Sequence, residues 1–356
     1  MTRRLMEGSE AIVEAAIAAG CRFFAGYPMT PFTEVLECFA RRLPETGGTC
    51  VNAESELEAV GMAWGAVATG ARSATGSTGQ GLSLMQESLS EITRAELPLV
   101  VFNMSRGQAD YYQSTRGGGH GDYRHIVLAP MDLHEAVELT QLAFHLADRW
   151  RNPVLIYGDY VLAHTSEAVD VTPLAFDSLP DKDWAVDGTL GGTGRSRVVN
   201  SLGFEKGSSE IDPEAFWQRL QQKHEAIARE EVRVESEFTE DAELIVVAFG
   251  TAARFVRHAV RALRKRGVRV GTLRPITLWP FPARELAAAV EGAARVAVFE
   301  LNAGQMIDDV RLAVLGRVPV VPIGGISTDV AGFGVGSLLD SERICDRIEN
   351  AWKEGR

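Results

Sequence analysis

The sequence predicts an α/β protein in which a doubly wound parallel sheet is followed by a second α/β domain. Over residues 1–165, short apolar stretches of strand type alternate with helical patterns of about ten to fifteen residues, as in parallel sheets with helices on both faces. The alternation stops over a polar, glycine-rich stretch and resumes after residue 240. A chain of 356 residues is long enough for two domains, each with its own core.

Hydrophobic periodicity identifies the elements of the first domain, residues 1–165. Residues 56–68 carry apolar side chains at helical spacing, and residues 97–103 form an apolar run typical of a buried strand. Proline is well tolerated at the first helical position, so Pro31 is expected to begin a helix. The expected strands are 22–25, 49–52, 72–75, 97–103, 126–129 and 154–157, and the expected helices are 10–19, 31–42, 56–68 and 133–147.

The rest of the chain divides into three parts. Residues 166–240 are expected to be a glycine-rich connector followed by a charged helix over 213–231. Residues 241–335 form the second alternating domain, and residues 336–356 form a tail with a surface helix over 340–353. Within the second domain the expected strands are 244–249, 268–273, 296–300 and 318–322, and the expected helices are 252–265, 284–290 and 305–315.

Composition and charge exclude several classes of protein. A formal net charge of −12 argues against nucleic acid or an anionic membrane as the main partner. No stretch approaches the roughly 18 apolar residues of a membrane span, and glutamates near the N-terminus interrupt any signal sequence. We therefore expect a cytoplasmic protein without a membrane partner.

The four cysteines do not form a metal-binding pattern. None is in a Cys-x-x-Cys pair, and none has a histidine at ligand spacing, so they are expected to be buried thiols. The chain is therefore expected to hold neither a metal ion nor an iron–sulfur cluster. These cysteines are Cys21, Cys38, Cys50 and Cys345.

Four features follow the ends of predicted strands in the first domain. Thr30 follows the first strand, Glu56 the second, a glycine-rich loop over 76–81 the third, and Arg106 the fourth. Ligands of open parallel sheets bind outside the carboxyl ends of the strands. We therefore expect these four features to share a pocket.

Each feature also has a structural interpretation. Ser55 and Glu58 match a capping box, which gives Glu58 a structural role. Glu56 is then the carboxylate available for a pocket, although a glutamate on a helix is usually exposed to solvent. The loop 76–81 lacks the spacing of nucleotide-binding motifs, but its glycines would let a ring approach the backbone. Arg106 is either a surface residue or a bidentate clamp for a substrate carboxylate.

His120 and Asp122 lie in a glycine-flanked stretch, Gly-Gly-Gly-His-Gly-Asp-Tyr. A histidine in such a position could transfer protons near neutral pH. It could equally order the loop through hydrogen bonds with the aspartate, and the sequence leaves both roles open. No Ser–His–Asp arrangement competes for a catalytic role.

Motifs spread over the chain indicate one family. In the first domain these are residues 27–31 (Tyr-Pro-Met-Thr-Pro), 56–61 (Glu-Leu-Glu-Ala-Val-Gly) and 77–85 (Ser-Thr-Gly-Gln-Gly-Leu-Ser-Leu-Met). In the second domain they are 250–253, 273–282 and 300–306. In colinear order over nearly the whole chain, they resemble the alpha subunit of 2-oxoacid:ferredoxin oxidoreductases. Residues 108–113 and 117–124 are most similar to the branch that acts on 3-methyl-2-oxobutanoate (ketoisovalerate).

The resemblance implies a pyrimidine-binding thiamine diphosphate domain over 1–165 and a transketolase C-terminal-like domain over 241–335. It implies that Glu56 hydrogen-bonds N1′ of the aminopyrimidine, that Thr30 lies near the substrate, and that Arg106 holds the 2-oxoacid carboxylate. These three are the expected catalytic residues. The residues expected to bind the cofactor are Glu56, Pro28, Thr30, Gly79, Gln80 and Gly81.

One departure from the family concerns the segment after Arg106. Relatives commonly carry a Gly-Pro-rich stretch there, whereas here Arg106-Gly107 continues directly into Gln108. The segment that borders the expected substrate site is therefore shorter than in those relatives.

The resemblance implies oxidative decarboxylation of a branched-chain 2-oxoacid with coenzyme A, giving acyl-CoA, CO2 and reduced ferredoxin. A beta subunit would hold the diphosphate of thiamine diphosphate and its Mg2+, because no Gly-Asp-Gly motif with a downstream Asn occurs here. Cysteine-rich gamma and delta subunits would hold the iron–sulfur clusters. The alternatives are the same chemistry on 2-oxoglutarate, pyruvate or an aryl 2-oxoacid, a transketolase-like or non-oxidative 2-oxoacid decarboxylase, and a non-catalytic scaffold subunit.

Overall fold

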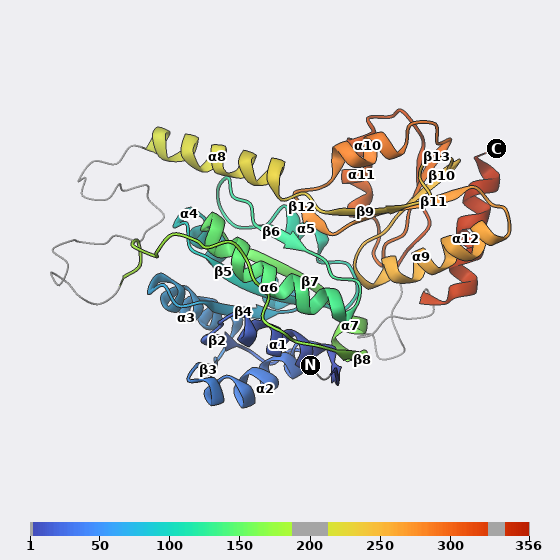
Figure 1. The fold of residues 1–356 in the computed structure, drawn as a ribbon. Helices are drawn as coiled ribbons and strands as arrows, with labels where there is room; N and C mark the ends of the chain where they lie inside the picture. The colour runs from blue at the N-terminus through green and yellow to red at the C-terminus, as the bar shows by residue number, and fades with distance from the viewer. Residues whose placement is uncertain (1–2, 187–212, 327–338, 356) are drawn as a thin grey trace.

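Two α/β sheets, one of seven strands and one of five, make up the framework of the protein (Figure 1). The structure, a computed structural model, describes residues 3–186, 213–326 and 339–355. The glycine-rich part of the expected connector lies largely outside the described residues. The predicted α/β fold class is confirmed, and the domain boundaries stay a prediction.

The seven-stranded sheet has the order β12-β6-β7-β5-β4-β2-β3. Its neighbours from β6 to β3 are all parallel, and only the edge strand β12 is antiparallel to β6. The strands are β2 (Phe23–Gly26), β3 (Thr49–Asn52), β4 (Ser73–Ser77), β5 (Leu99–Ser105), β6 (Ile126–Leu128), β7 (Val154–Asp159) and β12 (Thr277–Trp279).

Helices cover both faces of this sheet. On one face, α1 (Gly8–Ala18), α2 (Thr33–Arg42) and α6 (Leu133–Trp150) share a core with the strands through residues such as Ile12, Phe39 and Phe102. On the other face, α3 (Glu56–Ala68) and α4 (Gly79–Arg94) contribute Val60 and Met85 to a second core. That second core continues into the five-stranded sheet, so the two sheets are joined by apolar contact.

The five-stranded sheet has the order β14-β13-β10-β11-β9, with β9 antiparallel to β11 and the other pairs parallel. One face packs on α9 and α12, and the other faces the shared core with α10 and α11. The elements are β9 (Val234–Glu237), β10 (Leu244–Val247), β11 (Val270–Pro275), β13 (Arg295–Val298), β14 (Val320–Pro322), α9 (Gly250–Lys265), α10 (Ala283–Ala289), α11 (Met306–Val314) and α12 (Ser341–Glu354).

The remaining elements connect or extend these two units. The charged helix α8 (Pro213–Glu230) agrees closely with its predicted range and runs along the upper side of the first unit in Figure 1. None of the helices in the described parts of the chain is long and apolar enough to cross a membrane. The others are the antiparallel pair β1 (Arg4–Glu7) and β8 (Ser166–Val169), η1 (Pro44–Thr46), α5 (Tyr111–Thr115) and α7 (Tyr160–His164).

Two local expectations are corrected by the structure. Helix α2 begins at Thr33 rather than at Pro31, which lies in the turn before it after a cis peptide bond. The expected loop 76–81 is mostly regular structure, because β4 continues to Ser77 and α4 begins at Gly79. A further strand, β12, was not expected from the sequence; it follows β11 in sequence but pairs with β6 of the other sheet.

A buried arginine links the two units. Arg274 at the end of β11 is 4% exposed, and its guanidinium donates to both carboxylate oxygens of Glu135 on α6, at 2.8 and 2.6 Å. Its Nε also donates to Glu235 on β9 at 2.9 Å. Removing one partner of a buried, hydrogen-bonded ion pair leaves an uncompensated charge and is strongly destabilising.

We predict that Arg274→Gln lowers the free energy of unfolding by roughly 3 kcal/mol, because Glu135 loses its arginine partner and Glu235 keeps only Arg257. The control is Arg254→Gln, which removes an exposed ion pair with Glu167 and should cost less than about 1 kcal/mol. Urea unfolding of both variants, followed by circular dichroism, measures the difference. Equal losses for the two variants would show that the buried ion pairs of Arg274 add no more stability than an exposed one.

Candidate active site

The four strands that precede the expected site residues are neighbours in one sheet. Strands β5, β4, β2 and β3 are adjacent and parallel, so their carboxyl ends lie at the same edge. Thr30 follows β2, Glu56 follows β3, and Arg106 is the first residue after β5. These features therefore lie at one edge of the sheet, and the expected shared pocket stays a prediction.

Glu56 is a buried carboxylate at this edge. It is the first residue of α3 and is only 2% exposed. Ser55 is the N-cap, as predicted, and its hydroxyl accepts from the backbone N–H of Leu57 at 3.2 Å. Ser55 contacts Glu58 through the two side chains, and Glu58 is exposed. The two carboxylates thus differ as expected, with Glu58 at the helix cap and Glu56 turned into the protein.

Ser77 holds the Glu56 side chain. It is the last residue of β4, and its hydroxyl donates to Glu56 Oε1 at 2.8 Å. Gly81, in the first turn of α4, packs directly against both groups, because a Cβ at this position would overlap Ser77 Oγ and the Glu56 carboxylate. Glycine at 81 is therefore required for the carboxylate to lie where it does.

Arg106 lies over the same edge and contacts two of the expected residues. Its Nε donates to the backbone oxygen of Thr30 at 3.0 Å, and its Nη1 donates to Gln80 Oε1 at 3.3 Å. The structure thus joins Arg106, Thr30 and Gln80 in one group. Pro28 is exposed in the turn after β2, and no hydrogen bond within the described residues links it to the others.

Asp110 was missed by the sequence reasoning. It is 7% exposed and accepts from the backbone N–H of Gly79, the first residue of α4, at 3.2 Å. It also accepts from Asn103 at 3.3 Å and from Gln113 at 2.8 Å. Asp110 therefore fixes the start of the helix that carries Gln80 and Gly81. The only signal in the sequence was an acidic residue four positions after Arg106.

Two buried oxygen atoms near the edge have no hydrogen-bond partner within the part of the chain that the structure describes. They are Oγ1 of Thr78, between β4 and α4, and Oδ1 of Asn103 in β5. Buried polar atoms are nearly always paired, so such atoms indicate a place for a further polar group. Thr78 directly follows Ser77 in the chain, and Asn103 is its register partner on the neighbouring strand β5.

His120 and Asp122 lie away from this group. Both are exposed, and the backbone N–H of His120 donates to Glu87, two turns along α4, at 3.3 Å. Among the residues that the structure describes, no group of three or more His, Cys, Asp or Glu side chains could hold a metal ion.

The edge is one open wall rather than an enclosed cavity. Thr30 and Gln80 are exposed, as are three apolar side chains on the helices that begin here. Leu57 and Leu84 are each 53% exposed, and Met62 is 42% exposed. Larger hollows lie elsewhere in the described residues, for example one of about 550 Å3 lined by Glu243, Arg269 and Arg295.

Two protein-family models match the chain. The first, described as pyruvate flavodoxin/ferredoxin oxidoreductase, thiamine diphosphate-binding, matches residues 14–187. The second, described as pyruvate:ferredoxin oxidoreductase core domain II, matches residues 242–331. The first match includes all four strand ends of the candidate site.

Two known proteins are similar over nearly their whole length. Ketoisovalerate oxidoreductase subunit VorB of Methanothermobacter marburgensis is 40% identical over 323 residues, which cover 88% of this chain and 90% of that protein. 2-Oxoglutarate synthase subunit KorA of Methanothermobacter thermautotrophicus is 37% identical over 355 residues, covering 90% of this chain and 94% of that protein.

Two solved structures share the fold. The 2-oxoglutarate:ferredoxin oxidoreductase from Magnetococcus marinus, solved with 2-oxoglutarate, coenzyme A and succinyl-CoA bound, matches 99% of this chain with a TM-score of 0.83 and 25% identity. The chain spans 65% of that longer chain. A split-gene transketolase, an inactive beta4 tetramer, matches with a TM-score of 0.59 and 14% identity, which shows the fold alone.

We predict that Gly81→Ala lowers the free energy of unfolding by about 1–2 kcal/mol, because the new Cβ displaces Glu56 or Ser77. Gly65→Ala on α3 is the matched control. It has open space around its Cα and should be neutral or stabilising by up to about 1 kcal/mol through helix propensity. Thermal unfolding of the isolated chain measures both changes. If the two substitutions have the same effect, the close approach of α4 to Glu56 is contradicted.

Proposed function

Because the chain belongs to the family of 2-oxoacid:ferredoxin oxidoreductase subunits, we propose that it is the alpha subunit of a thiamine diphosphate-dependent enzyme acting on a branched-chain 2-oxoacid. The enzyme converts the 2-oxoacid and coenzyme A into acyl-CoA and CO2. One proton and two electrons are released as the acyl group passes to the thiol, and the electrons reduce ferredoxin. The observation that carries this proposal is the buried Glu56 carboxylate at the carboxyl edge of the sheet.

The residues at this edge fit an aminopyrimidine ring. Within the described residues, Ser77 alone donates to the Glu56 carboxylate and bonds Oε1, which leaves Oε2 for a ring nitrogen. The buried oxygens of Thr78 and Asn103 are partners for the polar groups of such a ring. Glycine at 81 lets the backbone of α4 lie directly against the carboxylate, so no Cβ displaces Glu56 from this position.

When bound, thiamine diphosphate supplies the nucleophilic carbon, C2 of its thiazolium ring, and accepts the electron pair that remains after loss of CO2. Glu56 would hold a proton at N1′ of the aminopyrimidine and take it back. The hydrogen bond from Ser77 orients the carboxyl group for this exchange. A carboxyl group is needed here, because an amide cannot give and recover a proton at this atom.

Arg106 is proposed to bind the carboxylate of the 2-oxoacid, with Thr30 and Pro28 beside it. Its bonds to the Thr30 carbonyl and to Gln80 hold the guanidinium over the same edge as Glu56. A planar guanidinium suits a carboxylate better than an ammonium does, because it offers parallel donors. The substrate would thus be held by groups that follow β5 and β2, the two strands on either side of β4.

The chain supplies one wall of the proposed site, and a beta subunit would supply the other, with the diphosphate and Mg2+. The exposed Leu57, Met62 and Leu84 flank the wall and suit contact with a partner chain. Cysteine-rich gamma and delta subunits would carry the iron–sulfur clusters that pass electrons to ferredoxin. Burial raises the pKa of Cys21 to about 12 and that of Cys50 to about 11, so these thiols stay protonated and are poor iron ligands. The proposed location is the cytoplasm.

The identity of the relatives supports a branched-chain substrate. Ketoisovalerate oxidoreductase subunits from two Methanothermobacter species are 39–40% identical to this chain, whereas the 2-oxoglutarate synthase subunits are 31–37% identical. 2-Oxoglutarate is the second candidate substrate, because the 2-oxoglutarate synthase subunits, like the ketoisovalerate oxidoreductase subunits, match most of the chain. 2-Oxoglutarate carries a second carboxylate that a branched-chain 2-oxoacid lacks, and this carboxylate needs a further cationic or polar partner.

We predict that Glu56→Gln lowers the turnover number of the assembled enzyme by about 100-fold or more, because the proton exchange is lost. The subunits should still co-purify, since the substitution keeps the size of the side chain. Glu58→Gln, two residues further on the same helix but exposed, should stay within about twofold of wild type. Unchanged turnover in Glu56→Gln would instead favour a scaffold role for this chain.

We predict that the assembled enzyme uses 3-methyl-2-oxobutanoate with a kcat/KM at least about tenfold above that for 2-oxoglutarate, pyruvate or an aryl 2-oxoacid. Formation of acyl-CoA and reduction of ferredoxin are measured for each substrate. Preference for 2-oxoglutarate would refute the branched-chain assignment. Release of an aldehyde without acyl-CoA or reduced ferredoxin would indicate a non-oxidative decarboxylase.

A further inference from the structure

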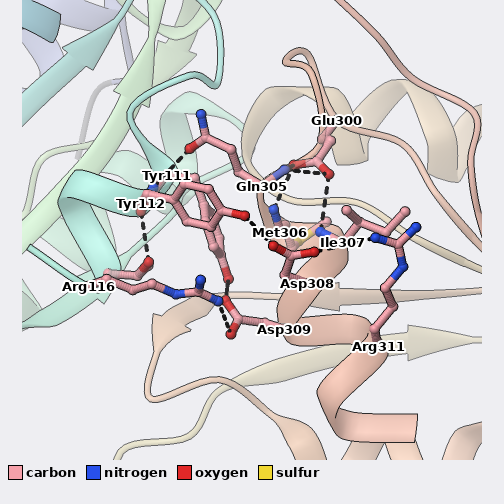
Figure 2. Close-up of polar contacts among 11 residues, drawn as sticks. Tyr111, Tyr112, Arg116, Glu300, Gln305, Met306, Ile307, Asp308, Asp309 and Arg311 are labelled. Atoms are coloured by element: carbon pink, nitrogen blue, oxygen red, sulfur yellow. Dashed lines mark hydrogen bonds and ion pairs between the residues drawn. The ribbon is translucent and has the colours of Figure 1, made fainter. Parts of the chain in front are cut away.

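The segment that follows Arg106 is bound to the second unit of the protein. We call residues 107–112 the strap. It leaves the carboxyl end of β5 and crosses to the loop between β13 and α11, residues 299–305. Figure 2 shows part of this contact, with Tyr111 and Tyr112 facing the start of α11. The strap therefore joins the proposed substrate arginine to the five-stranded sheet.

Gln108 is the centre of the strap and is completely buried. Its side chain donates to the backbone oxygen of Phe249 at 2.9 Å and accepts from the backbone N–H of Leu301 at 2.9 Å. Its own N–H donates to the Leu301 oxygen at 3.3 Å, and its carbonyl accepts from Asn302 at 2.8 Å. The side-chain amide, the backbone N–H and the backbone carbonyl of Gln108 thus all have hydrogen-bond partners in the second unit.

The rest of the strap is held in the same way. Gln305 donates to the oxygen of Ala109 at 2.8 Å and accepts from the N–H of Tyr112 at 2.9 Å. The Tyr111 hydroxyl donates to Asp309 at 2.7 Å. Burial, reinforced by Asp309, raises the pKa of Tyr111 well above its ordinary value, so the hydroxyl remains a donor.

The surface that receives the strap is itself ordered. The carboxylate of Glu300 accepts from the backbone N–H groups of residues 305, 306 and 307, at 2.8 to 3.1 Å (Figure 2). These are the unpaired donors at the start of α11, which a carboxylate stabilises. Arg116, just beyond the strap, adds an ion pair with Asp309 at 2.8 Å.

The strap also reaches the proposed active site from two sides. Its first residue, Gly107, directly follows Arg106 and lies close to the backbone oxygen of Leu301. A Cβ on Gly107 would be 3.3 Å from that oxygen. Asp110 bonds the N–H of Gly79 at the start of α4. A displacement of the strap would therefore move both the arginine and the helix that carries its partner Gln80.

We propose that Gln108 is a positioning residue, through which the second unit sets the place of Arg106 and of the start of α4 for binding the 2-oxoacid carboxylate. This inference rests on the proposed function of Arg106. A shift of about 1 Å in a positioning group can lower the rate about 100-fold. Without the Gln108 amide, the Phe249 oxygen and the Leu301 N–H lose their partner, and the strap loses its fixed register.

The test uses the assembled enzyme with Gln108→Leu. The value of kcat/KM for the 2-oxoacid should fall by about 10- to 100-fold, while KM for coenzyme A stays within about twofold of wild type. Gln141→Leu is the matched control. Gln141, on α6, is also buried and bonds two backbone groups, Thr172 O and Leu174 N–H, and neither of these belongs to the strap or to the second unit. It should leave the KM for the 2-oxoacid unchanged.

A second variant and a second measurement keep the test decisive if Gln108→Leu does not fold. Asn302→Asp preserves the acceptor for the N–H of Gly304 but replaces the donor to the Gln108 carbonyl. It should give the same loss in kcat/KM for the 2-oxoacid. Hydrogen–deuterium exchange should also be faster over 78–82 and 106–110 in both variants than in wild type, and unchanged there in Gln141→Leu.

The outcomes separate the two proposals. Wild-type kinetics for the 2-oxoacid in the strap variants, or the same effect in Gln141→Leu, would overturn the positioning role. If the wild-type enzyme turns over no 2-oxoacid, the proposed function fails. In that case the exchange experiment still decides whether Gln108 fixes residues 78–82 and 106–110, because it does not depend on activity.

Discussion

The parallel pairing of β5, β4, β2 and β3 is the constraint on which the rest of the site depends. Parallel neighbours end at the same edge, so residues from four separate turns meet there. The helices that leave these turns then decide which side chains enter the protein. Glu56 is the first residue of α3, directly after the Ser55 cap, and its side chain is buried. Gly81 allows α4 to pack against its carboxylate.

The second unit has a structural part in this site even though it carries no residue proposed to bind the cofactor. One apolar core runs from α3 and α4 along one face of the seven-stranded sheet to the five-stranded sheet, and the ion pair of Arg274 with Glu135 joins the two units. The strap adds directional bonds to this packing at the point where β5 ends. The short segment after Arg106 is suited to this role, because few residues separate the arginine from its anchors.

Much of the fold and half of the site were accessible from the sequence. Alternating periodicity identified the main strands and helices, and the positions after strand ends brought Thr30, Glu56 and Arg106 together. The capping pattern correctly separated Glu56 from Glu58. Pairing between distant segments was not accessible, because β12 returns to the first sheet and Gln108 bonds Leu301 without any local pattern that records it. Asp110 was missed for the same reason.

The central claim is that Glu56 controls a proton at N1′ of bound thiamine diphosphate. The most direct measurement is the rate at which the C2 proton of the cofactor, bound to the assembled enzyme, exchanges with deuterium. We expect fast exchange in wild type and exchange slower by about 100-fold or more in Glu56→Gln with the cofactor still bound. Equal exchange rates in the two proteins would contradict this role for Glu56.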